Sequence, residues 1–202
     1  AVGPSGQVTG LDLAPGMVTR TAAAAAEHPQ VTVRIGDAQQ PDVPAASVDV
    51  LTAGLVLFFL PDPAAALTAY RTILRPGGRL GVTAFAAFDP QYQQIMKIVA
   101  RYAVDPRRPP ALAPMFATGD SLAAAATEAG YTTPAVTEFA VQSRLRDIDQ
   151  LLAWIGSHNG QATLGKVPEA RRPKLRDALA AEFTGPLTLT TRIRVLVAVR
   201  PA

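Results

Sequence analysis

Short apolar runs alternate with helix-forming stretches through the first half of the sequence, and this alternation restricts the fold more than any other feature. Strands are predicted at 7–12, 31–35, 48–53 and 79–85, with helices at 15–27 and 63–75. Strands that are connected through helices make right-handed crossovers and pair in parallel. The sequence therefore predicts an α/β protein with a doubly wound, mostly parallel sheet.

The second half departs from this pattern before it resumes. Proline is frequent in residues 86–117, where one helix is expected at 91–103, and we interpret this insertion as a helical lid over the sheet. The elements predicted after it are a helix at 119–129, a strand at 135–142, helices at 147–157 and 168–183, and a last strand at 187–199. No linker composition separates these parts, so residues 1–202 are predicted to form a single domain.

A proline and two glycines follow the second predicted helix in the segment Leu74-Arg75-Pro76-Gly77-Gly78. Proline cannot continue a helix, and glycine readily adopts the backbone angles of a turn. The segment is therefore predicted to end the helix and to turn the chain into the strand at 79–85.

Composition excludes several classes of protein. Hydrophobic residues make up 49% of the chain, enough for a core, yet no apolar stretch near the length of a membrane span lacks a charge or a proline. The net charge of +3 is dispersed and aromatic residues are only 6%, which favours a solvated surface over a nucleic-acid interface. No cysteine is present, and no group of His, Asp and Glu has the spacing of metal ligands, so no metal is predicted.

Two acidic residues and a glycine fall at the predicted carboxyl ends of strands, where open parallel sheets bind ligands. Asp12 could accept two hydrogen bonds from a ribose diol, or it could cap the following helix. Asp37 could accept from the exocyclic amine of a base, with the N–H of Ala38 facing a ring nitrogen, or it could be a turn residue. Gly54 would allow a ligand close to the backbone. The three positions together predict a nucleoside site.

Three apolar side chains near these positions have two interpretations each. Met17 could lie against a purine, although its helical spacing is more typical of a core residue. Phe58 and Phe59 could form a wall beside a cationic group, but we interpret them as core residues.

The ordered set of segments Gly10–Leu13, Gly36–Ala38, Leu57–Asp62 and Leu74–Leu80 resembles the motifs of class I S-adenosylmethionine-dependent methyltransferases. It is most similar to the ubiquinone/menaquinone-biosynthesis-like branch of small-molecule enzymes. The resemblance implies a seven-stranded Rossmann-like sheet with an antiparallel last strand. It also implies that Asp12 holds the ribose, Asp37 and Ala38 hold the adenine, and Gly54 lies near the methionine part of the cofactor. The predicted cofactor-binding set is completed by Leu13, Met17, Gly36 and Leu55.

Two departures from the family pattern affect these expectations. The family begins with a strand and a glycine-rich loop that precede the strand at 7–12, and this strand should lie between 7–12 and 48–53; we therefore expect an N-terminal piece in the functional protein. Many relatives also carry a histidine where Phe58-Phe59 stands here. His158 is the candidate for a catalytic general base, and its alternative is a structural role.

The resemblance implies methyl transfer from S-adenosylmethionine to a small, fairly apolar molecule at O, N or C. Segments 86–117 and 147–183 would form the acceptor pocket, with Tyr102 and Trp154 either lining it or lying in the core of the lid. The alternatives are a non-catalytic ligand- or partner-binding module and a nicotinamide-dependent oxidoreductase. The expected partner is the small-molecule acceptor, without nucleic acid or membrane, in a cytoplasmic protein that could form a homodimer.

Overall fold

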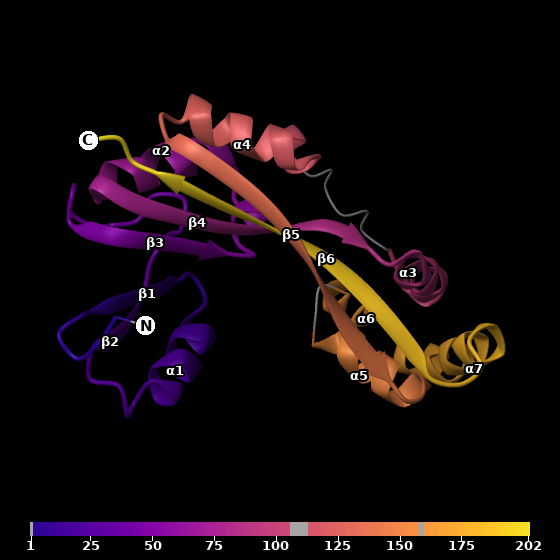
Figure 1. Ribbon diagram of the computed structural model, residues 1–202. Coiled ribbons are helices and arrows are strands. Elements are labelled where there is room, and N and C mark those ends of the chain that lie inside the picture. Colours follow the sequence, from indigo (N-terminus) through magenta and orange to yellow (C-terminus); the bar gives the residue numbers. More distant parts are fainter. Residues whose placement is uncertain (1, 106–112, 158–159) are drawn as a thin grey trace. The chain divides into compact units, whose positions relative to one another are not determined.

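The computed structural model describes residues 2–105, 113–157 and 160–202, and its elements alternate as predicted for an α/β protein (Figure 1). The strands are β1 (Val8–Asp12), β2 (Val31–Ile35), β3 (Val48–Gly54), β4 (Leu74–Phe88), β5 (Thr132–Leu145) and β6 (Leu187–Val199). The helices are α1 (Pro15–Ala24), α2 (Pro63–Ile73), α3 (Pro90–Tyr102), α4 (Gly119–Glu128), α5 (Ile148–Gly156), α6 (Gln161–Leu164) and α7 (Arg172–Glu182). Short 3-10 turns occur at η1 (Leu57–Phe59), η2 (Pro114–Phe116) and η3 (Glu169–Arg171).

The strands form two sheets in the described residues. β1 pairs in parallel with β2, and the second sheet has the order β3-β4-β6-β5, in which β3 and β4 are parallel. β6 runs antiparallel to β4, because the N–H of Gly77 donates to the carbonyl of Arg200 at 2.9 Å and the N–H of Arg200 donates to Gly78 at 2.8 Å. The start of β4 therefore lies beside the end of β6. The predicted α/β fold is thus confirmed, with a mixed sheet and an antiparallel last strand.

β1 and β3 are both edge strands of their sheets within the described residues. These are the two strands that the sequence predicted to flank a further strand. Their free edges present unpaired backbone groups, which sheets normally pair or cover. The flanked strand itself stays a prediction.

β4 is longer than the sequence predicted and begins directly after α2. Val48 lies opposite Leu74, but Val50 lies opposite Arg79, so three extra residues of β4 form a bulge. Gly77 within the bulge has a φ of 76°, a left-handed value that glycine adopts without steric cost. The expected Pro-Gly-Gly turn is therefore wrong as a separate connection, because the segment bulges within the strand instead.

α2 is fixed at its start and along one face. The Asp62 side chain accepts from the N–H of Ala65 at 2.9 Å, and Pro63 occupies a first-turn position where no N–H is needed. The buried face of α2 consists of Ala66, Leu67, Tyr70 and Ile73. Ala66, Leu67 and Tyr70 pack into a core with residues of β3, β4, β6 and α4.

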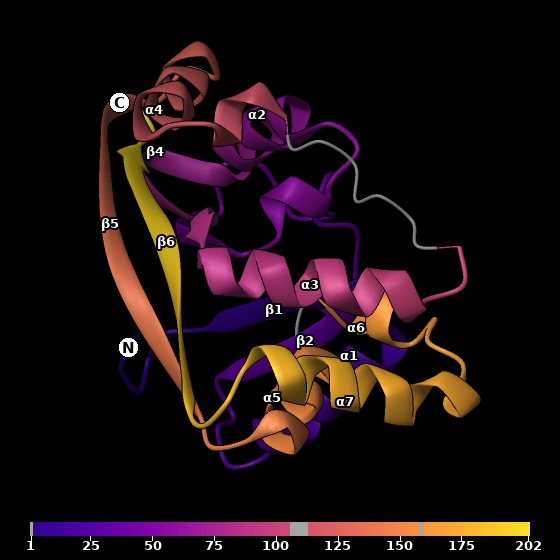
Figure 2. The same ribbon diagram turned by 90° about the vertical axis from the view of Figure 1, so that its right-hand side faces the viewer.

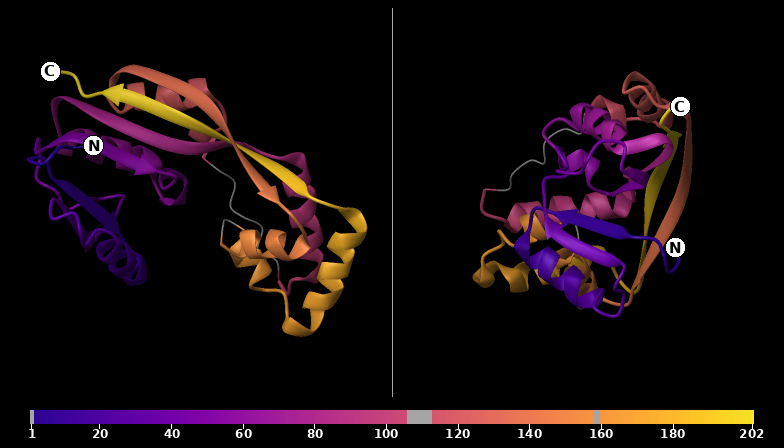
Figure 3. Two further views of the ribbon diagram at one scale, coloured as in Figure 1. Left: turned by 60° about the horizontal axis from the view of Figure 1, so that its bottom comes forward. Right: turned by 90° about the vertical axis from the view of Figure 1, so that its left-hand side faces the viewer.

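The chain divides into two compact units. The first contains residues 1–84, 113–137 and 195–202, and in it α1 packs on the β1–β2 pair (Figure 3). The second contains residues 85–112 and 138–194, where α3 and α7 lie side by side around a separate apolar core (Figure 2). The segments predicted as lid and acceptor pocket fall mainly in the second unit, and those roles, like the single-domain boundaries, stay predictions. In the described residues, no helix combines the length and apolar character that crossing a membrane requires.

Candidate cofactor-binding site

Asp12 ends β1 in a short turn that its own side chain stabilises. Its Oδ1 accepts from the N–H of Ala14 at 2.8 Å, and its backbone carbonyl accepts from the N–H of Gly36 at 3.1 Å. The N-cap of α1 is Ala14, so the alternative that Asp12 caps this helix is wrong. The carboxylate is instead held in an Asx turn, which leaves Oδ2 without a hydrogen bond to any described residue.

Asp37 repeats this arrangement two residues beyond β2. Its Oδ1 accepts from the N–H of Gln39 at 2.7 Å, again in an Asx turn, and its second oxygen has no hydrogen bond within the described residues. The two carboxylates follow neighbouring parallel strands, since Asp12 pairs with Ile35 in the β1–β2 register. The turn interpretation of Asp37 is therefore correct for one of its oxygens, and the other is available to a ligand.

The turn after β2 is tied to α2 by two further hydrogen bonds. The Tyr70 hydroxyl donates to the carbonyl of Ala38 at 2.6 Å, and the N–H of Asp62 donates to Oε1 of Gln39 at 2.8 Å. Burial, and to a lesser degree the negative charge of Asp37, raises the pKa of Tyr70 to about 12. The hydroxyl therefore remains protonated near neutral pH and keeps donating to Ala38.

Sequence reasoning missed both Tyr70 and Gln39. A signal for Tyr70 existed, because it shares the apolar face of α2 with Ala66 and Ile73, and a buried tyrosine hydroxyl usually finds an acceptor. No signal identified that acceptor as Ala38, 32 residues away.

Replacing Tyr70 with Phe should destabilise the protein by about 1–3 kcal/mol, because the half-buried Ala38 carbonyl loses its donor. The change should also alter the pH dependence of unfolding. The folded pKa of Tyr70 lies above its ordinary value of 10.0, so the unfolded chain loses this proton first. Below pH 10 the raised pKa of Tyr70 contributes fully to the free energy of unfolding. This contribution, about 2–3 kcal/mol, is lost as the pH rises toward 12.

Urea unfolding at neutral pH and between pH 10 and 12 measures both effects. Tyr92, whose pKa burial also raises to about 12, provides the comparison, because its decline should persist in the Tyr70→Phe variant. An alkaline decline of the same size in the variant and the parent protein would contradict the prediction.

The two glycines of the predicted site, Gly36 and Gly54, differ in whether the surrounding protein leaves room for a side chain. A Cβ on Gly36 would lie 3.1 Å from Cδ2 of Leu11, a tight contact with β1 that favours glycine at this position. A Cβ on Gly54 would meet only Oγ1 of Thr83, at 4.0 Å. Gly54 is exposed at the end of β3, so the surrounding protein does not demand glycine at this position.

Leu55, directly after Gly54, has a φ of 53°. This left-handed conformation costs a residue with a Cβ about 1–2 kcal/mol. The Leu55 N–H donates to both the carbonyl and Oγ1 of Thr83, at 3.2 and 2.9 Å. The backbone directly after β3 is therefore strained, and its hydrogen bonds to Thr83 anchor it to β4.

Two of the three apolar side chains that were expected in the core are exposed. Met17 is 48% exposed and Phe59 is 72% exposed, so the core interpretation is wrong for both. α1 has no buried residue because it covers only the two-stranded β1–β2 pair. Leu13, between Asp12 and α1, is 64% exposed. Phe58 is half-buried and packs edge-on against Phe116, with ring centroids 6.2 Å apart, so it does contribute to the core.

Three further residues were predicted to take part in catalysis or to line the acceptor pocket. His158 lies outside the described residues. Trp154 and Tyr102 both pack against the core of the second unit, and Trp154 meets Tyr92 edge-on with centroids 5.6 Å apart.

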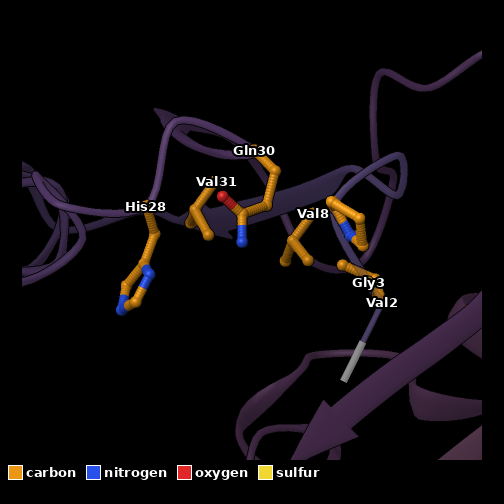
Figure 4. A pocket seen from close by; sticks show the side chains of 7 residues that line it. Val2, Gly3, Val8, His28, Gln30 and Val31 are labelled. Carbon is orange, nitrogen blue, oxygen red and sulfur yellow. The ribbon is translucent and has the colours of Figure 1, made fainter.

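An apolar hollow lies at the opposite ends of β1 and β2, where these strands begin. Figure 4 shows His28, Gln30, Val31 and Val8 around it. Asp12 and Asp37 follow the other ends of the same strands. The hollow is therefore separate from the predicted nucleoside site.

Comparisons with known proteins identify the family of the chain. Residues 1–82 match the family described as "Methyltransferase domain". Nocamycin O-methyltransferase from Saccharothrix syringae is 33% identical over 202 residues, covering 93% of this chain and 71% of that protein. Aklanonic acid methyltransferase from Streptomyces sp. (strain C5) is 38% identical over 84 residues, which are 41% of this chain and 38% of that protein.

A likeness in fold extends over nearly the whole chain. The crystal structure of a putative methyltransferase from Bacillus halodurans superposes with a TM-score of 0.60 at 15% identity, covering 97% of this chain and 84% of that one. The family relationship disfavours the nicotinamide-dependent and non-catalytic alternatives. The chain belongs to the class I S-adenosylmethionine-dependent methyltransferases, and it is an enzyme that transfers a methyl group from this cofactor to a small molecule.

Proposed function

We propose that the strand ends around Asp12, Asp37 and Gly54 hold S-adenosylmethionine. The observation that carries this proposal is the pair of Asx turns, each of which fixes one carboxylate oxygen and leaves the other without a hydrogen bond to a described residue. A carboxylate oriented in this way can accept from a hydroxyl or an amine without disturbing its turn. Asp12 would receive the ribose hydroxyls, and Asp37 would receive the adenine amine.

The neighbouring residues complete this assignment. The Ala38 carbonyl is engaged by Tyr70, while its N–H has no acceptor among the described residues and is available for a ring nitrogen. Leu13, next to Asp12, and Met17, in the first turn of α1, are exposed apolar residues that would contact the adenosine. Gly36 permits the close approach of Leu11, and Gly54 with Leu55 would lie near the methionine part.

When bound, S-adenosylmethionine supplies an electrophilic methyl group on its sulfonium. The chain contributes by holding the acceptor and cofactor in place, because fixing two reactants in an in-line geometry removes much of the barrier. An acceptor hydroxyl with a high pKa also benefits from a base, and His158 remains our candidate.

We further propose that the acceptor is small and fairly apolar and that it is methylated at oxygen. The names of the two relatives give nocamycin and aklanonic acid as the molecules concerned, and the first specifies oxygen. Aromatic side chains accumulate in the second unit, where the Phe88 ring lies 4.8 Å from Phe85 and 5.6 Å from Tyr92. Such rings suit an apolar acceptor bound by segments 86–117 and 147–183.

The partner and compartment proposals follow the composition. With dispersed charge and few aromatic residues, the enzyme would act on its small molecule in the cytoplasm, without nucleic acid or membrane. The homodimer remains a separate prediction, which sedimentation of the purified protein would test.

Titration calorimetry with S-adenosylhomocysteine and NAD tests the cofactor assignment. We expect binding of S-adenosylhomocysteine and none of NAD, because the chain belongs to a family that uses S-adenosylmethionine. Binding of NAD alone would overturn the assignment. Mass spectrometry of aklanonic acid incubated with the enzyme and S-adenosylmethionine then tests the acceptor class, with fragmentation locating the added methyl group.

A further inference from the structure

The end of β3 holds a leucine in a conformation that leucine rarely adopts. Leu55 has a φ of 53°, and its branched apolar side chain has no polar atom that could compensate locally, as the side chains of Asn and Asp can. Backbone strain of this kind persists only where the surroundings impose it, and it accumulates at functional sites. Ala46, Asp105 and Thr133 share a positive φ, but Leu55 alone among these four directly follows a strand end assigned to the cofactor.

Thr83 on β4 accepts both hydrogen bonds that the Leu55 N–H makes. It lies opposite Gly54 in the β3–β4 register, and the Leu55 N–H donates both to its carbonyl at 3.2 Å and to its Oγ1 at 2.9 Å. Thr83 is half-buried and β-branched, so its side chain has few rotamers in a strand. Two acceptors on one restricted residue therefore fix the direction of a single N–H.

Fixing this N–H also fixes the carbonyl of the same peptide unit. In a planar trans peptide, the N–H of Leu55 and the carbonyl of Gly54 point in opposite directions. The N–H points to β4, so the Gly54 carbonyl is directed away from β4, toward the free edge of β3. Rotation of this peptide would change the backbone surface that a ligand meets at Gly54.

We propose that Thr83 is a positioning residue for the cofactor: its hydroxyl locks the strained Leu55 peptide and thereby keeps the end of β3 in the shape that binds S-adenosylmethionine. This inference rests on the proposed placement of the cofactor at Gly54. The alternative is that the hydroxyl only provides a hydrogen-bond acceptor for the backbone N–H at the end of β3. In that case its removal would lower stability without a selective effect on the cofactor.

Thr83→Val and Thr83→Ser separate these roles. Valine keeps the shape and the backbone acceptor but removes Oγ1, while serine keeps the hydroxyl. We expect Thr83→Val to weaken S-adenosylhomocysteine binding about fivefold in calorimetry, as the loss of one ordinary hydrogen bond predicts, and Thr83→Ser to restore binding to near the parent value. Amide hydrogen exchange at Leu55 without ligand should be faster in Thr83→Val and close to the parent rate in Thr83→Ser.

Thr52→Val is the matched control, because Thr52 lies on β3 opposite Gly81 and has an exposed side chain. It should change neither measurement. Unchanged S-adenosylhomocysteine affinity in a folded Thr83→Val protein would overturn the proposal, whatever happens to exchange at Leu55. If Thr83→Val does not fold, Thr83→Ala is compared with Thr83→Ser in the same two measurements. Failure of the parent protein to bind S-adenosylhomocysteine would instead overturn the cofactor assignment, and exchange at Leu55 would still report whether the lock exists.

Discussion

Replacing Asp12 with Asn is expected to weaken S-adenosylhomocysteine binding by about tenfold to a hundredfold while leaving the fold intact. Asparagine retains a side-chain oxygen, so it can still accept from the N–H of Ala14 and keep the Asx turn at the end of β1. The change removes only the negative charge and one acceptor. Hydrogen bonds to a charged acceptor contribute about 1.5–3 kcal/mol, which gives the expected loss of affinity.

Asp42→Asn is the matched control for this substitution. Asp42 is exposed, and its carboxylate makes a loose ion pair with Arg34 at 3.9 Å. Surface pairs of this kind contribute little to stability, so both affinity and unfolding should remain unchanged. Calorimetry and urea unfolding of the two variants distinguish the effect of removing a charge at the site from the effect of removing a charge elsewhere on the surface. Equal affinity in Asp12→Asn and the parent protein would show that Asp12 does not hold the ribose.

Much of the fold was predictable because its signals are local. The alternation of apolar runs and helices gave the correct order of strands, and the predicted bounds of the last strand, 187–199, coincide with β6. The positions of Asp12 at the end of β1 and of Asp37 shortly after β2 were predictable for the same reason, since a strand end is a local feature of the sequence. The bulge in β4 was not predictable, because it depends on how Leu74 and Arg79 align with β3.

The supports of the candidate site were not predictable because they connect distant parts of the sequence. The Tyr70 hydroxyl reaches Ala38 across 32 residues, and the Thr83 hydroxyl reaches Leu55 across 28. The exposure of Met17 and Phe59 was also not predictable, because it too depends on distant parts of the chain. Helical spacing and apolar character indicated core residues, but core packing requires a covering element that local sequence does not specify.

Substitution of Gly54 is expected to have the second large effect on cofactor binding. The position could be glycine because the fold requires it or because the ligand requires it, and the two explanations make opposite predictions. If the protein needed glycine there, a side chain would destabilise the fold; if a ligand needs it, a side chain would obstruct binding. A Cβ at this position meets only Oγ1 of Thr83 at 4.0 Å, and the φ of Gly54 is not left-handed. We therefore expect Gly54→Ala to raise stability by up to about 1 kcal/mol, since alanine restricts the unfolded chain.

The same variant should bind S-adenosylhomocysteine more weakly, and Gly54→Val should lower the affinity by about tenfold to a hundredfold, because added methyl groups in a close contact cost about 1–3 kcal/mol. Gly81→Ala is the control, since its Cβ would lie 3.7 Å from Cγ2 of Thr52, an ordinary contact within the sheet. It should leave the affinity unchanged. Calorimetry and urea unfolding on all three variants measure the two quantities separately. A gain in stability together with a loss of affinity cannot come from misfolding, so this combination would place the cofactor against Gly54. Undiminished affinity in Gly54→Val would show that the cofactor does not contact Gly54.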